Sequence, residues 1–153
     1  HRGISAFESG VMLFLFGAIR MLFFCRASMI KMGVEPRALL ASVGLFMIYV
    51  GERPSVYLGV ILIGAAISLI YAYTIESILA GEEETVGLRA GIFEGSMGIG
   101  FIFGPFLAGL AATLSLSYAF LIASLSGLVF VATLRIGKAR SRTLQSNTTA
   151  NKN

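Results

Sequence analysis

Residues 55–75 read SVYLGVILIGAAISLIYAYTI, a stretch of 21 residues that contains no charged side chain. About 20 apolar residues in a helix are needed to cross the ~30 Å hydrocarbon core of a bilayer. A transmembrane barrel strand would instead alternate apolar and polar residues over about ten positions, and this stretch does not. Because lipid offers the backbone no hydrogen-bond partners, a helix is the remaining solution. The stretch therefore predicts a transmembrane helix.

The same apolar character extends along most of the chain. Hydrophobic residues make up 56% of it and charged residues 13%, with a mean hydropathy of +0.84, whereas a soluble domain has about a quarter of its residues charged. We predict an all-α, polytopic bundle of about five transmembrane helices. The basic and polar residues 138–153 are expected to form a disordered cytoplasmic tail. The predicted spans are about 9–31, 36–51, 55–80, 88–113 and 117–137.

With five spans, the basic residues fall almost entirely on one side of the membrane. One side receives Arg26, Lys31, Arg37, Arg89, Arg135, Lys138, Arg140, Arg142 and Lys152. The other side receives only Arg2 and Arg53. Cytoplasmic loops carry an excess of Lys and Arg. We therefore expect an integral protein of the cell (plasma or inner) membrane with a cytoplasmic C-terminus.

The fourth block, 88–113, is unusually rich in glycine. Small residues recur every four positions along it, which predicts a groove where a neighbouring helix backbone can approach closely. A proline within the block removes one backbone hydrogen bond and promotes a kink. Tight structural packing and a helix that bends and slides in a conformational cycle are both compatible with this pattern. The candidate packing and hinge residues are Gly91, Gly95, Gly100, Gly104, Pro105 and Gly109.

Two charged residues, Arg20 and Glu94, lie inside predicted spans. A charge within a span is costly and usually faces a cavity or a partner. We therefore expect contact with a solute, with a coupling ion or with each other, and Glu94 is the better candidate for a coupling proton. In the structural alternative Arg20 snorkels or pairs within the bundle and Glu94 lies near the cytoplasmic interface. Further candidates along a solute path are Tyr71, Tyr73 and Glu76.

The stretch from Arg89 to Gly109, with Gly100-x-x-x-Gly104-Pro105 inside a span, resembles the eleventh helix of major facilitator transporters. It is also similar to the Gly-Pro motif in the fifth helix of their antiporter members. The resemblance makes the five blocks helices eight to twelve, the C-terminal half without its first helix. It implies alternating-access transport of a small solute, with blocks 9–31, 55–80 and 88–113 facing the path and the other two facing lipid.

The resemblance has limits. The family's loop between helices eight and nine often carries an Asp, which this chain lacks, so a gating ion-pair role is not carried over. A major facilitator needs two six-helix halves around a central site. The chain opens with His1-Arg2, without an initiator Met or a signal-peptide pattern. We therefore expect a fragment that is inactive alone and whose partners are the lipid bilayer and the missing N-terminal helices of the same protein.

Other function classes find little support. An intramembrane enzyme needs paired Asp, His or Ser-Lys groups, but the chain has no Asp and its one His is His1. With Cys25 as the single cysteine, we expect no metal site, no cofactor and no enzymatic activity, and the basic residues do not form a nucleic-acid-binding stripe. The alternative that stays open is a small stand-alone membrane protein acting through helix–helix association. The sequence does not identify the solute or a coupling ion.

Overall fold

The computed structural model describes residues 5–150, with side chains as far as residue 140, and this part of the chain is helical without a strand. This confirms the predicted all-α bundle. The elements are α1 (Ala6–Cys25), the short 3₁₀ helix η1 (Ala27–Met29), α2 (Val34–Val50), α3 (Arg53–Leu79), α4 (Glu83–Ala112) and α5 (Leu116–Ala150).

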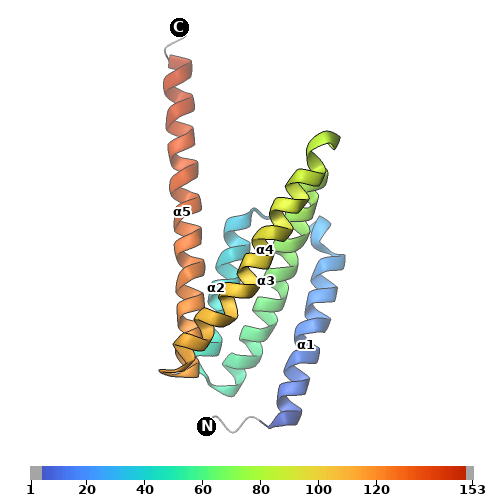
Figure 1. Ribbon diagram of the computed structural model, residues 1–153, viewed down its shortest axis with the longest axis vertical. Coiled ribbons are helices and arrows are strands. Elements are labelled where there is room, and N and C mark those ends of the chain that lie inside the picture. The colour runs from blue at the N-terminus through green and yellow to red at the C-terminus, as the bar shows by residue number, and fades with distance from the viewer. Residues whose placement is uncertain (1–4, 151–153) are drawn as a thin grey trace.

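The helices alternate in direction, so their links gather at two opposite ends of the bundle (Figure 1). The links at 26–33 and 80–82 lie at the end toward which α5 runs, and the links at 51–52 and 113–115 lie at the other. The first end therefore carries Arg26, Lys31 and the basic residues of α5. We call it the basic end.

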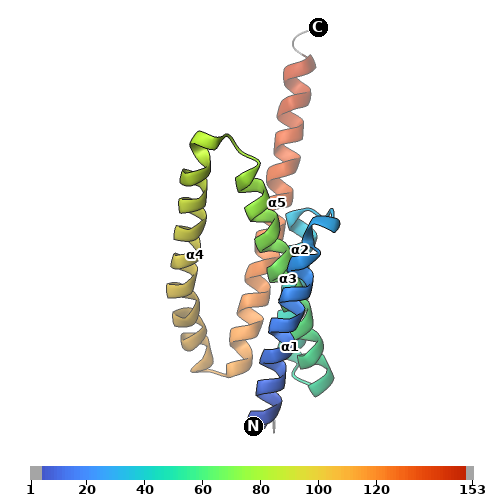
Figure 2. The same cartoon turned by 90° about the vertical axis from the view of Figure 1, so that its right-hand side faces the viewer.

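The helices form two layers. In the first layer α3 packs against α1 and α2, and α2 packs against α5. Helix α4 forms the second layer, where it contacts α5 and, to a smaller extent, α3 (Figures 1 and 2). Within the described chain α4 makes no contact with α1 or α2. Much of α4 is consequently uncovered.

Four helices are long and apolar enough to cross a membrane: α1, α3, α4 and the part of α5 from Leu116 to Arg140. Helix α2 has 17 residues, about 25 Å at 1.5 Å per residue, and corresponds to the shortest predicted block. Its exposed large apolar residues lie three or four positions apart, which places them on one face. They are Leu39, Val43, Phe46 and Val50.

Helices α1 and α4 begin well before their predicted spans, for local reasons. Helix α1 begins at Ala6 because Ser5 and Glu8 form a capping box, with Ser5 N donating to Glu8 Oε2 at 2.8 Å and Glu8 N donating to Ser5 Oγ at 3.1 Å. It ends at Cys25, six residues before the predicted limit. Helix α4 begins at Glu83, inside the predicted loop, since acidic residues in a first turn favour the positive end of the helix dipole.

The C-terminal boundary also differs. Helix α5 continues to Ala150, thirteen residues beyond the predicted limit at residue 137. Those residues contain no proline, and the Ala, Arg, Lys, Leu and Gln among them have good helix propensity. The last three residues of the expected tail lie outside the described residues.

Small residues bring α2, α3 and α5 close together, in a contact that we call the small-residue seam. A Cβ atom on Gly59 of α3 would lie 2.6 Å from the Gly44 carbonyl oxygen of α2, and one on Gly44 would lie 2.9 Å from the Gly59 oxygen. On the other side of α2, the buried Ser124 hydroxyl donates to the Ser42 carbonyl at 2.8 Å, and a Cβ on Gly127 would collide with the Ser42 hydroxyl. The seam is the best-packed part of the bundle.

Candidate functional site

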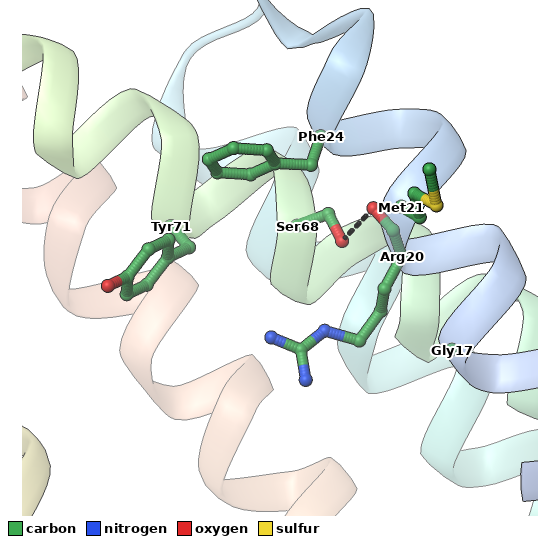
Figure 3. Close-up of a pocket in the computed structure, with 6 residues that line it drawn as sticks. All are labelled: Gly17, Arg20, Met21, Phe24, Ser68 and Tyr71. Carbon is green, nitrogen blue, oxygen red and sulfur yellow. Dashed lines mark hydrogen bonds between the residues drawn. The ribbon is translucent and has the colours of Figure 1, made fainter.

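A pocket of about 320 Å³ lies between α1 and α3. We call it the Arg20 pocket. Five of its six lining residues are uncharged, and the exception is Arg20 (Figure 3). The predicted candidates Arg20 and Tyr71 meet here. The lining residues are Gly17, Arg20, Met21, Phe24, Ser68 and Tyr71.

The backbone of α1 is held in place beside this pocket. The buried Ser68 of α3 donates from its hydroxyl to the Arg20 carbonyl oxygen at 3.0 Å, and it also lies 2.9 Å from the Gly64 oxygen. One turn earlier in α3, a Cβ on Gly64 would lie 3.2 Å from the Phe16 carbonyl oxygen, so the two helices nearly touch there. The Cα of Arg20 therefore has a fixed position relative to α3.

The Arg20 side chain points toward the middle of α1. Its guanidinium carbon lies 5.5 Å from the centre of the Phe16 ring, one helical turn toward the N-terminus. Figure 3 shows the guanidinium on the side of its own backbone away from Phe24. At 1.5 Å per residue, Phe16 is about 13 Å from the Cys25 end of a helix about 30 Å long. The guanidinium thus turns away from the nearer helix end instead of snorkelling toward it.

No counterion accompanies this cation. In the part of the chain with described side chains, Arg20 has no carboxylate within ion-pair distance, and its guanidinium makes no hydrogen bond. An arginine at the centre of a transmembrane helix costs about 2.5–3.5 kcal/mol on insertion scales. A charged residue placed in a span at that cost usually faces a cavity or binds a partner.

An aromatic chain connects the pocket to α4. Tyr71 lies 6.2 Å from Phe24 of α1 and 5.7 Å from Phe93 of α4, measured between ring centres. The three rings follow one another across the bundle from α1 through α3 to α4, and Glu94 is the neighbour of Phe93 in the sequence. The two charges do not form an ion pair, and Glu94 is exposed.

The remaining path candidates lie nearer the basic end. Glu76 lines two neighbouring pockets, of about 570 and 480 Å³, and Tyr73 lines the second of them. Neither residue lines the Arg20 pocket. The structure therefore divides the five candidates. Arg20 and Tyr71 line one pocket, Glu94 lies on α4, and Tyr73 and Glu76 lie closer to the basic end.

The sequence analysis counted Arg37 only among the basic residues on one side of the membrane, but the structure buries it to 3% exposure. One guanidinium nitrogen donates to the Leu69 carbonyl at 2.7 Å and another to the Ile30 carbonyl at 3.1 Å. The guanidinium carbon also lies 4.7 Å from the centre of the Tyr73 ring. A cation in the first turn of a helix is disfavoured by the helix dipole. The position of Arg37 at the start of the second block, where the helix dipole disfavours a cation, was therefore the sequence signal that its guanidinium needs other partners.

The six glycines of α4 from Gly91 to Gly109 have no neighbour in the described part of the chain. A Cβ atom built on any of them would have no atom within 4 Å, apart from its own local helix, in the part of the chain that is described. Pro105 lies inside the continuous helix α4. The predicted close approach of another helix therefore stays a prediction for a contact outside these residues. The glycines concerned are Gly91, Gly95, Gly98, Gly100, Gly104 and Gly109.

Comparison with known proteins adds no relative: no protein-family model, curated protein or solved structure matches the chain. Among residues 5–140 there is also no cluster of three or more His, Cys, Asp or Glu side chains with the geometry to hold a metal ion. The arrangement of the Arg20 pocket is the remaining guide to function.

Proposed function

We propose that this chain is part of a secondary transporter of the major facilitator type, in which α1, α3 and α4 line the path of a small solute. The observation that carries the proposal is the Arg20 guanidinium, which is directed toward mid-span and has no counterion among the described side chains. A charge held at such a depth normally faces a substrate or ion pathway. The resemblance of residues 89–109 to a transporter helix supports the same function.

The exposed surfaces of the helices support this division of roles. The outer face of α2 presents a row of large apolar side chains, as contact with lipid requires. Helix α4 also exposes large apolar side chains, and among them it presents glycines and the charge of Glu94. In the proposed transporter, further helices of the same protein pack against α4, and the chain alone does not transport. The basic end is the cytoplasmic end, in keeping with the excess of Lys and Arg there.

In this proposal Glu94 carries the coupling proton. The movement of α4 between two arrangements would change the surroundings of Glu94. The glycines and Pro105 provide the flexibility, because neither supports a rigid, fully hydrogen-bonded helix.

The test is solute-driven proton flux in proteoliposomes made with the complete gene product. A pH-sensitive dye inside the vesicles reports acidification after addition of sugars, amines, carboxylates or peptides. We expect one solute class to produce flux, Glu94→Gln to abolish the proton signal, and Arg26→Gln, at an exposed position outside the pocket, to leave it unchanged. Absence of flux for all four classes, or full flux in Glu94→Gln, would refute the proposal.

A second candidate function is assembly of a small membrane protein through α4. The uncovered glycine face of α4 favours it, since close helix association in lipid depends on small residues. In that case residues 1–153 alone would form an oligomer of defined size in lipid nanodiscs, and Gly100→Leu would dissociate it. The transporter proposal instead expects no dependence of oligomeric state on Gly100.

A further inference from the structure

We infer that the Arg20 pocket binds the carboxylate of a small organic monoanion with an aromatic or branched apolar body. The inference deepens the proposed function by naming its substrate class, and it rests on that function. Four observations carry it: the charge of the pocket, its free hydrogen-bonding groups, its apolar wall and its depth.

The charge of the pocket favours an anion. Arg20 is the single ionisable group with a charge at neutral pH among the six lining residues. The nearest acidic candidates, Glu76 and Glu94, do not line the pocket. A cationic solute would be repelled by the guanidinium, and an uncharged solute would leave it uncompensated in an apolar region. One unpaired cation matches one carboxylate.

Two polar groups are free to hold that carboxylate. The guanidinium presents planar N–H donors that match the two oxygens of a carboxylate. The Tyr71 hydroxyl makes no hydrogen bond to the described residues, so it can also donate. Ser68 is different, because its hydroxyl hydrogen already bonds within the bundle. Ser68 therefore positions the Arg20 backbone instead of recognising the ligand.

The other walls of the pocket fit an apolar body. In Figure 3 the guanidinium and the rings of Phe24 and Tyr71 surround one opening, and Met21 adds a flexible apolar side chain. Aromatic rings pair well with one another in tilted arrangements. The volume of about 320 Å³ is at the lower end of the range for ligand pockets, which indicates a small molecule.

The depth of the pocket separates this ligand from a lipid headgroup. The guanidinium is directed to the level of Phe16, about 13 Å from the nearer end of α1. Phospholipid phosphates lie at the membrane surface, outside the hydrocarbon core. A soluble monocarboxylate that enters the path is therefore the ligand that the position of Arg20 fits.

The test is equilibrium binding of radiolabelled benzoate to the full chain in nanodiscs of zwitterionic phosphatidylcholine. Unlabelled benzoate, benzamide and benzylamine serve as competitors of the same size and differing charge. We expect saturable benzoate binding, with benzamide and benzylamine each at least about tenfold weaker as competitors. This comparison uses the unaltered protein, so it does not depend on the folding of a variant. Absence of saturable benzoate binding, or equal competition by benzamide, would overturn the inference.

Substitutions then locate the site. We expect Arg20→Gln to weaken benzoate binding at least about tenfold, Arg20→Lys to retain part of it, and Arg26→Gln to match the unaltered chain. Circular dichroism confirms that each variant is folded. Unchanged benzoate binding in folded Arg20→Gln would overturn the assignment to this pocket.

The two proposals can fail separately. Benzoate binding without flux in the complete protein would support the anion-site proposal and refute the transport proposal. Flux of uncharged solutes that is insensitive to Arg20→Gln would support the transport proposal and refute the anion-site proposal.

Discussion

The small-residue seam and α4 contain the same kind of residue in opposite situations. In the seam, Gly44 and Gly59 let two helix backbones approach so closely that a single Cβ atom would collide. In α4, a Cβ on any of six glycines from Gly91 to Gly109 would meet no neighbour in the described chain. Glycine weakens a helix by about 1 kcal/mol relative to alanine. In the seam, close packing of the helices offsets that cost. In α4, no contact with the described residues offsets it.

The contrast indicates that the two regions serve different purposes. The seam is a permanent contact, supported by buried serine hydrogen bonds and by Arg37 at its basic end. The glycines of α4 suit either a partner helix outside these residues or a helix that changes shape. The following predictions test whether the contrast holds, beginning with the largest expected effect.

The largest effect is expected from a bulky side chain in the seam. Gly59→Leu would force α2 and α3 apart and lower the free energy of unfolding by about 3 kcal/mol, the upper end of the usual cost of overpacking. Gly98→Leu in α4 is the matched control and should leave the stability of residues 1–153 unchanged or slightly raise it. Denaturation in mixed micelles with increasing SDS, followed by circular dichroism, measures both. Equal destabilisation by the two variants would remove the distinction between the regions.

Removal of the buried cation should have the next largest effect. Arg37→Met keeps the apolar stem but loses two charge-assisted hydrogen bonds and the contact with Tyr73. We expect a loss of about 2 kcal/mol in the same SDS titration. The control is Arg26→Met, at an exposed position of the same end. A loss no greater in Arg37→Met than in the control would show that Arg37 does not stabilise the seam.

A smaller effect is expected at the contact of α2 with α5. Ser124→Ala removes the hydrogen bond to Ser42, which should cost about 0.6 kcal/mol, the average found for such bonds in membranes. Ser126 also donates a hydrogen bond, but to Ile122 of its own helix and at an exposed position. Ser126→Ala should therefore have a smaller effect, and the reverse order would contradict the account of the seam.

The smallest effect concerns pH and the ion pairs of Glu35. The hydrogen bond from Lys138 is the largest effect on the Glu35 carboxyl and lowers its pKa. Desolvation opposes it as the second-largest effect, and the nearby charges of Lys138 and Arg135 add to the lowering. Because the folded-state pKa is below the unfolded value, the stabilisation is complete above the unfolded pKa of about 4.3 and is lost as pH falls through the folded pKa.

Glu35→Gln should therefore be slightly less stable than the unaltered chain at pH 7, and the difference should be smaller at pH 3. Thermal unfolding at the two pH values measures the difference. A stability difference that persists unchanged at pH 3 would exclude the ion pairs as its source.

The apolar pattern was sufficient to predict the helices but not the helix ends. Residues 55–75 lie within α3 because a long uncharged stretch has one solution in lipid. The start of α1 depends on the Ser5–Glu8 capping box, a local signal that the analysis of apolar blocks passed over. The start of α4 depends on acidic residues that were interpreted as a loop.

The site was predicted only in part, since contacts depend on which helices become neighbours. Arg20, singled out in the sequence as an intramembrane charge, lines a pocket, and its place on a solute path stays a prediction. Spacing could not show that Gly44 and Gly59 meet a backbone while the more numerous glycines of α4 do not. The burial of Arg37 likewise follows from carbonyl groups of Leu69 and Ile30, which come together only in the folded bundle.

The most direct test of the proposed path is the reactivity of single cysteines in membranes of cells that express the complete gene product. In a Cys25→Ser background, Met21→Cys places a thiol in the Arg20 pocket and Phe46→Cys places one on the outer face of α2. Both native side chains are exposed, at 72% and 46%, but thiolates form only in contact with water. We predict that a membrane-impermeant thiol reagent modifies Met21→Cys and not Phe46→Cys. Equal reactivity at the two positions, or none at Met21→Cys, would contradict a water-filled solute path along α1 and α3.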